Sequence, residues 1–248
     1  MSDGIRFAYT FLMFDPAISP HFHLVQVWQG NWIAECVRMD VEGVHCYSSE
    51  VRGWSDRSSE WKRGGEGGEW EQWGEALIQH KIGRAFVNGM LHFVVYHLHQ
   101  QEALIVALDV KGKTCWITRW EEKHKHSGVT FIGQSQGRLH CISMDKELRS
   151  YLSVWVLEDY DTEEWILKHR VNCSKLFGKM NCSFFYFSVV AIHPDHNVVF
   201  FVQHWNNQKL LSYNMDSREL HGLCSDYEST SSTSYVPYFM ESAALANK

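Results

Sequence analysis

The amino-acid sequence predicts an all-β, β-propeller-like fold with about four recognisable four-stranded blade units. Aromatic residues make up 14% of the 248 residues, including 11 tryptophans, and large aromatic side chains favour strands. Pairs of hairpins recur along the chain at a nearly constant spacing, whereas helix signals are almost absent. Four-stranded units of about 45–50 residues are typical of propellers, in which each sheet buries its faces against its neighbours.

The first unit is expected near the N-terminus. An apolar strand at Phe11–Phe14 precedes a polar turn at Asp15–Pro20, and a return strand spans Phe22–Trp28. A third strand at Gly43–Tyr47 leads through a turn to Trp54, which marks the fourth strand. The alternation of strand-like and turn-like segments predicts a four-stranded meander.

The second unit contains the strongest hairpin signal. Asn88 and Gly89 lie between apolar runs in the segment Ala85–Phe93, and both residue types tolerate the positive φ of a two-residue turn. A second hairpin follows, with one strand at Leu104–Leu108 and a return strand that carries Trp116.

The third unit repeats the second. Its first hairpin turns at Gln134–Gly137, and its second hairpin runs from Tyr151–Leu157 to a return strand with Trp165. Apolar groups lie on both faces of the strand at Leu152–Leu157, which predicts a strand enclosed between two neighbouring sheets. Three pairs of landmarks are 48 or 49 positions apart, namely Gly89 and Gly137, Leu108 and Leu157, and Trp116 and Trp165.

A looser fourth unit follows, with one hairpin at Val189–Gln203 and another at Lys209–Leu223. The propeller-like domain is therefore expected over residues 5–240. Residues 241–248 are expected to form a C-terminal tail, and the best helix signal is a short stretch at Met240–Asn247. Because propellers usually close a ring to protect their terminal edges, we expect either a missing N-terminal part or an open, incomplete ring.

Composition and charge exclude several classes of function. The net charge of −6 argues against nucleic-acid binding, which requires a basic surface. The longest apolar stretches, residues 184–192 and 198–202, are far shorter than the roughly 20 residues of a membrane-spanning helix. No secretory signal is visible after Met1, so we expect a cytoplasmic or nuclear protein. Reduced and mostly buried cysteines are expected in those compartments; the chain has Cys36, Cys46, Cys115, Cys141, Cys173, Cys182 and Cys224.

Six short motifs, taken in their order along the chain, point to a known family. They are Phe14-Asp15-Pro16-Ala17-Ile18-Ser19-Pro20-His21, Val44-His45-Cys46-Tyr47-Ser48-Ser49, Gly133-Gln134-Ser135-Gln136-Gly137-Arg138-Leu139-His140, Leu152-Ser153-Val154-Trp155-Val156-Leu157-Glu158-Asp159-Tyr160, Ala191-Ile192-His193-Pro194-Asp195 and Tyr235-Val236-Pro237-Tyr238-Phe239. In this order they resemble the F-box-associated propeller domain of plant F-box proteins, particularly the grass subfamily. The resemblance extends from about residue 5 to the C-terminus.

The resemblance implies a kelch-like propeller that captures a protein for ubiquitination, as the substrate-recognition region of an SCF-type E3 ubiquitin ligase receptor. In that family an N-terminal F-box docks on a Skp1-like adaptor. The sequence before Phe11 has no room for an F-box, so an adaptor is expected as a partner only if an F-box exists upstream in the full-length product. The family supplies no fixed catalytic residues.

Histidines are the first candidates for a metal site. Three His-x-His pairs would each place two imidazoles on one face of a strand, but a zinc site needs three or four converging ligands. No cysteine or carboxylate stands at a matching spacing, so we expect structural histidines and no metal. The pairs are His21 with His23, His97 with His99, and His124 with His126, and a further pair in His193-Pro194-Asp195-His196 suits a turn.

Other chemical motifs have simpler explanations. The acidic run Glu158–Glu164 lies at a predicted turn and lacks the glycine spacing of a calcium loop. No Gly-Lys-Ser/Thr follows the glycines of Gly64–Gly68, which excludes a phosphate-binding loop, and no G-x-S-x-G motif marks a nucleophilic serine. We therefore expect no catalytic residue, no cofactor and no enzymatic activity.

Tryptophans are the best local indication of function. Trp54, Trp116 and Trp165 hold equivalent positions in successive units, which predicts packing between blades. Tryptophans in or near predicted loops either recognise a protein partner or pack in the core; they are Trp28, Trp32, Trp61, Trp70, Trp73 and Trp120.

The predicted function is a non-catalytic protein-interaction domain, with rigid blades that hold variable loops on one face. One alternative is a propeller enzyme or small-ligand binder that uses the central channel. Another is a truncated product without independent function.

Overall fold

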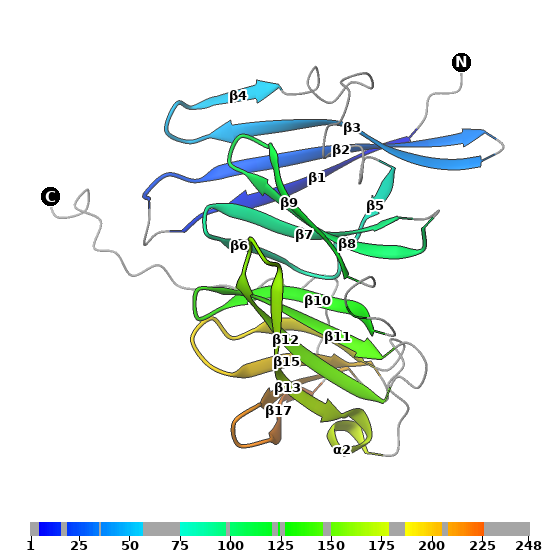
Figure 1. The fold of residues 1–248 in the computed structure, drawn as a ribbon, viewed down its shortest axis with the longest axis vertical. Helices are drawn as coiled ribbons and strands as arrows, with labels where there is room; N and C mark the ends of the chain where they lie inside the picture. Colours follow the sequence, from blue (N-terminus) through cyan, green and yellow to red (C-terminus); the bar gives the residue numbers. More distant parts are fainter. Residues whose placement is uncertain are drawn as a thin grey trace, which may run out of the picture.

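The computed structural model describes residues 5–15, 19–34, 36–56, 75–97, 100–120, 124, 127–145, 150–178, 187–204 and 208–225, excluding the side chains of residues 5, 31–40, 56 and 115. Four antiparallel sheets follow one another along the chain (Figure 1). The predicted all-β, propeller-like fold is confirmed, because each predicted blade unit corresponds to one of these sheets.

The strands have the following bounds. The first sheet contains β1 (Ile5–Met13), β2 (His23–Ala34), β3 (Cys36–Ser48) and β4 (Gly53–Asp56). The second contains β5 (Ala76–Ile78), β6 (Arg84–Val87), β7 (Met90–His97), β8 (Glu102–Asp109) and β9 (Thr114–Arg119). The third contains β10 (Ser127–Ser135), β11 (Arg138–Asp145), β12 (Tyr151–Asp159) and β13 (Glu164–Asn172). The fourth contains β14 (Phe187–Ile192), β15 (Val198–Gln203), β16 (Lys209–Asn214) and β17 (Glu219–Ser225).

The second sheet differs from a simple meander because its first strand is divided. β5 pairs with the end of β7, and β6 pairs with the beginning of β7. Gly83, just before β6, has a φ of 88° and forms a parallel bridge to Ile132 of the third sheet. A Cβ at this position would collide with the Ile132 carbonyl oxygen. Glycine is therefore required at this close contact between the two sheets.

Alternating side chains bury both faces of the second sheet. In β8, Leu104, Val106 and Leu108 belong to the core shared with the first sheet. The intervening Ala103 and Ile105 belong to the core shared with the third sheet. Because successive strand residues point to opposite faces, one strand contributes to two interfaces.

The third sheet is used in the same way. In β11, Leu139 and Cys141 pack toward the second sheet, whereas Ile142 and Met144 pack toward the fourth sheet. The strand that the sequence predicted to be enclosed between two sheets is therefore enclosed, with Leu152 on the fourth-sheet side and Leu157 on the second-sheet side.

Polar side chains also connect neighbouring sheets. The buried Gln29 amide donates to the Ala76 carbonyl oxygen at 2.7 Å and accepts from the Ile78 N–H at 3.5 Å. The Phe86 N–H donates to Gln134 Oε1 at 3.2 Å, between the second and third sheets. Ser135 Oγ donates to the His193 carbonyl oxygen at 2.7 Å, between the third and fourth sheets. Each pair of neighbouring sheets thus has a hydrogen bond besides its apolar core.

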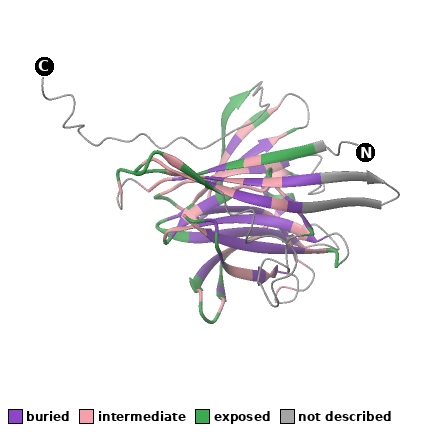
Figure 2. Ribbon diagram, turned by 90° about the horizontal axis from the view of Figure 1, so that it is seen from above, coloured by how far each residue is buried: buried purple, intermediate pink, exposed green. Residues whose placement is uncertain are grey.

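The described sheets form an open series. No core cluster of the described residues combines the first sheet with the fourth, and Figure 1 shows these two sheets at opposite ends of the molecule. Exposed residues follow the start of β1 beside the N-terminal label, whereas the middle sheets are largely buried (Figure 2). Among the described sheets, the first packs against the second on one face and against no sheet on the other.

One short helix was not predicted. Helix α2 (Cys173–Phe177) follows β13, and the Asn172 side chain accepts the Ser174 N–H at 2.8 Å as an N-cap. None of the described helical residues forms a segment able to cross a membrane. The helix predicted at Met240–Asn247, the tail at 241–248 and the glycines of Gly64–Gly68 lie outside the described residues.

The expectation of reduced cysteines fails at Cys173. Cys46 and Cys141 are buried and not disulfide-bonded, as expected, and Cys224 is exposed and not disulfide-bonded. Cys173, however, is disulfide-bonded. Cysteine spacing along the chain does not show which thiols the fold brings within bonding distance, so this bond had no signal in the sequence.

Two histidines are buried within the stacked sheets. His92 on β7 is fully buried, and its Nε2 lies 3.2 Å from the Tyr160 hydroxyl oxygen. His140 on β11 is 1% exposed. Burial disfavours the charged imidazole and lowers the pKa of each histidine to about 4. Both side chains are neutral in the folded protein near pH 7.

Truncation of a core side chain tests the two-sided packing. Leu104→Ala should lower the free energy of unfolding by about 2–5 kcal/mol, because Leu104 is fully buried between the first and second sheets. Leu223→Ala, at a side chain that is 52% exposed, should change it by less than about 0.5 kcal/mol. Urea denaturation followed by circular dichroism measures both. Equal effects of the two substitutions would contradict the packing.

Acid should destabilise the fold through the buried histidines. Between about pH 6.5 and pH 4 the unfolded state protonates both imidazoles while the folded state does not, so the unfolding free energy falls as pH falls. The loss should approach about 3 kcal/mol for each histidine. Urea denaturation at several pH values measures this slope. His92→Gln should reduce the slope, and the control His221→Gln, at an exposed position, should leave it unchanged. An undiminished slope in His92→Gln would show that His92 is not its source.

Candidate protein-interaction surface

The uncovered face of the first sheet carries a row of apolar side chains. Leu12 pairs with Leu24, Leu24 with Tyr47, and Tyr47 with Trp54. Directly opposite residues of antiparallel strands lie on the same face, so these four residues, here called the apolar row, cross the sheet from β1 to β4. Leu12 is 53% exposed and Trp54 is 54% exposed, although both are large apolar residues.

Aromatic contacts extend the apolar row toward the turns. The Tyr47 ring lies 5.4 Å from the Trp54 ring and 6.0 Å from the ring of Phe22, measured between centroids. Val51, in the turn between β3 and β4, is also strongly exposed. Contiguous exposed apolar patches of this kind mark interaction sites in soluble proteins. Four of the nine large exposed apolar residues described lie in the apolar row or its adjoining turns, namely Leu12, Phe22, Val51 and Trp54; the others are Phe7, Tyr151, Ile166, Leu167 and Leu223.

A pocket lies on the same face, farther along the strands. It has a volume of about 460 Å³ and is lined by Arg6, Trp28, Glu42, Gly43 and His45. These residues come from β1, β2 and β3, so the pocket is built on strands and not on loops. The pocket and the apolar row lie on the same face of the first sheet, against which none of the other described sheets packs.

A β-bulge and a glycine place the Glu42 carboxylate in this pocket. The pairing of β2 with β3 shifts between Trp28 and Gln29, which leaves Glu42 as the extra residue. Bulges of this kind redirect side chains. The Glu42 carboxylate lies over Gly30, where a Cβ would collide with it, and Glu42 Oε2 lies 2.9 Å from Arg6 Nε.

Hydrogen bonds fix the aromatic wall of the pocket. The indole N–H of Trp28 donates to Gln26 Oε1 at 3.0 Å, and Gln26 Nε2 donates to Thr10 Oγ1 at 3.1 Å. The His45 ring lies edge-on to the indole, with 6.2 Å between centroids. Because its N–H is already bonded, the indole offers a ligand its ring face and edge.

The described histidines of the predicted His-x-His pairs lie in different environments. His21 is exposed and His23 is half-buried at the start of β2, whereas His124 packs against Trp120 with 4.2 Å between ring centroids. His99 and His126 lie outside the described residues. Within the described ranges, no group of three or more His, Cys, Asp or Glu side chains is arranged to hold a metal ion.

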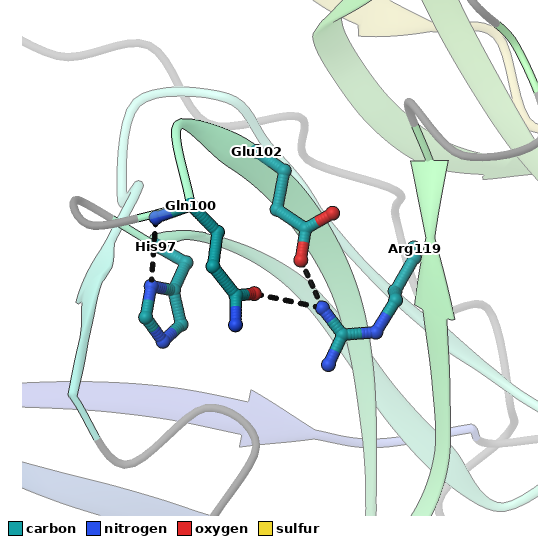
Figure 3. Close-up of polar contacts among 4 residues, drawn as sticks. All are labelled: His97, Gln100, Glu102 and Arg119. Atoms are coloured by element: carbon teal, nitrogen blue, oxygen red, sulfur yellow. Dashed lines mark hydrogen bonds and ion pairs between the residues drawn. The ribbon is translucent and has the colours of Figure 1, made fainter.

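His97 takes part in a polar network at one end of the second sheet (Figure 3). Its Nδ1 accepts the backbone N–H of Gln100 at 3.4 Å. Arg119 Nη1 donates to Gln100 Oε1 at 2.8 Å and also forms an ion pair with Glu102. These contacts connect the β7–β8 turn to the end of β9, which is a structural role.

Side-chain hydrogen bonds hold the two polar turns that the sequence predicted at Glu158–Glu164 and His193–His196. Asp159 Oδ1 accepts the N–H groups of Asp161 and Thr162, and these bonds hold the pKa of Asp159 below its usual value. His193 Nδ1 accepts the N–H groups of Asp195 and His196. Side-chain bonds of this type shape turns, as the sequence predicted for both segments.

The tryptophans divide between core and surface. Trp165 is buried and Trp116 packs against it between the second and third sheets, as predicted. Trp54 is 54% exposed, and no sheet among the described residues packs against its face of β4, so the prediction that it packs between blades was wrong. Trp120 is fully buried and so belongs to the core. Trp61, Trp70, Trp73 and the Trp32 side chain are not described.

Sequence reasoning missed Arg6, Glu42 and the two leucines of the apolar row. Alternation along β1 was a usable signal for Leu12. Phe11 and Leu12 are both apolar and point to opposite faces of the strand, so an apolar residue lies on each face. The bulge at Glu42 had no local signature. Its position depends on the register between two long strands, which the hydrophobic pattern of one strand does not fix.

Comparison with known families agrees with this fold. A family described as the F-box associated beta propeller domain matches residues 64–223. The match includes the whole second, third and fourth sheets nearly to the end of β17. Comparison with curated proteins gives no match.

Removal of an exposed aromatic ring tests the apolar row. Trp54→Ser should lower the fluorescence of the apolar dye ANS bound to the folded protein, because it removes a large exposed ring of the patch. The unfolding free energy should change by less than about 0.5 kcal/mol. Ile166→Ser, at an exposed residue of the third sheet, is the matched control and should bind more dye than Trp54→Ser. Equal dye binding by both variants would contradict a patch on the first sheet.

Proposed function

The chain belongs to the F-box associated beta propeller domain family, and we propose that it is a non-catalytic module that captures a protein substrate. Its role would be that of the substrate-recognition region in an SCF-type E3 ubiquitin ligase receptor of a plant. The propeller-like domain would span residues 5–240 and act in the cytoplasm or nucleus.

The uncovered face of the first sheet is the observation that carries this proposal. Exposed aromatic and apolar side chains are enriched where proteins bind each other. The row from Leu12 to Trp54 offers such side chains on a sheet whose other face is packed against the second sheet. A packed support keeps the exposed side chains in place, which lowers the entropic cost of binding.

Delivery to a ligase needs a second contact. In F-box receptors that contact is made by an F-box bound to a Skp1-like adaptor, and the adaptor would be a partner here only through an F-box upstream in the full-length product. The propeller-like part would supply substrate capture alone. The net charge of −6 favours encounters with a basic partner surface.

Capture experiments with matched variants test the proposed function. The folded chain, immobilised and exposed to a native extract, should retain a defined protein. Addition of soluble chain should compete for that protein and reduce its retention. Trp54→Asp should reduce its retention about tenfold or more, because a charge would replace a large exposed ring of the apolar contact. Ile166→Asp places the same charge on an exposed apolar residue of β13 and should leave retention unchanged.

Two outcomes would count against this proposal. Failure of the folded wild-type chain to retain any protein would contradict an interaction function. Retention that is lost equally in Trp54→Asp and Ile166→Asp would place the binding surface elsewhere or indicate a general loss of structure. Circular dichroism of each variant separates these two explanations.

A further inference from the structure

We propose that the pocket of Arg6, Trp28, Glu42, Gly43 and His45 receives the cationic side chain of an arginine or lysine on the captured protein. This inference rests on the proposed function and names the chemistry by which a partner is recognised. The pocket lies on the same strands as the apolar row, with Trp28 and Leu24 both on β2 and four residues apart. Four strand residues span about 13 Å, so one partner surface can reach both.

The carboxylate of Glu42 is the fixed charge of the pocket. It is held by a bulge in β3 and by the space above Gly30, and its side chain is 23% exposed. The Arg6 side chain, by contrast, is 66% exposed. An ion pair with one mostly solvated partner is weak, so Arg6 can leave the carboxylate at little cost.

Arg6 itself shows which chemistry the pocket accepts. Its guanidinium contacts Glu42 at 2.9 Å in a cavity that still has a volume of about 460 Å³. A partner's guanidinium or ammonium group can take the same position on the carboxylate. Replacement of an internal cation by an external one leaves no buried charge unpaired, which is the main penalty in such sites.

The aromatic wall adds a second attraction for a cation. Trp28 is fixed by its bond to Gln26, and an indole is the most favourable ring for a cation–π contact. His45 closes the side of the pocket beside Trp28. A carboxylate next to an indole selects a cationic side chain with an apolar stem over a neutral or anionic one.

Titration with small probes tests the charge preference directly. Nα-acetyl-arginine amide and Nα-acetyl-lysine amide should bind the full chain in low salt, whereas the neutral Nα-acetyl-citrulline amide should bind at least about tenfold more weakly. Nuclear magnetic resonance should show the largest shift at the Trp28 indole N–H, assigned through Trp28→Phe. Inorganic phosphate and acetate should cause no shift there.

Variants distinguish a cation site from an anion site. Glu42→Gln should weaken binding of the arginine amide about tenfold, and Arg6→Gln should strengthen it several-fold, because the internal competitor is gone. The matched control Glu50→Gln removes a carboxylate from an exposed turn residue of the same sheet and should have no effect. Binding of phosphate that is lost in Arg6→Gln would overturn the proposal, and so would absence of arginine-amide binding in both wild type and Arg6→Gln.

The same variants separate this inference from the proposed function. If the chain captures a protein that Glu42→Gln retains as well as wild type, the interaction function stands and the pocket assignment fails. If the wild-type chain captures no protein, the proposed function fails even when the pocket binds the arginine amide.

Discussion

Face-to-face packing of two-sided apolar sheets is the interaction on which the rest of this structure depends. The second and third sheets bury alternate side chains of the same strands in two different cores. Each sheet is therefore stabilised by its neighbours and not by itself. Among the described residues, those of the first sheet belong to one of these cores. Its other face carries the exposed apolar row beside the pocket of Arg6 and Glu42, and this exposure creates the candidate surface.

Local sequence signals were enough to predict the sheets. Asn88 and Gly89 both adopt positive φ at the turn between β6 and β7, as the Asn-Gly pair predicted. The repeat of Gly89 and Trp116 as Gly137 and Trp165 predicted the third sheet from the second. These features depend on residues close in sequence, for which turn chemistry and side-chain alternation are reliable guides.

The candidate site was harder to predict because it depends on contacts between distant segments. Trp54 has the same place in its sheet as Trp165, yet only Trp165 has a neighbouring sheet to pack against. The position of Glu42 depends on the register of β3 against β2. The hydrogen bonds of Gln29 connect residues more than forty positions apart. The first sheet also lies outside the family match at residues 64–223, so that match gives no information on its exposed face.

The central claim is that the uncovered face of the first sheet contacts the captured protein. Hydroxyl-radical footprinting of the complex measures the exposure of single side chains and tests this claim most directly. The account predicts that oxidation of Leu12, Tyr47 and Trp54 falls on binding, while oxidation of Ile166 and Leu167, which are exposed on the third sheet, does not change. Protection confined to the second, third and fourth sheets would contradict it.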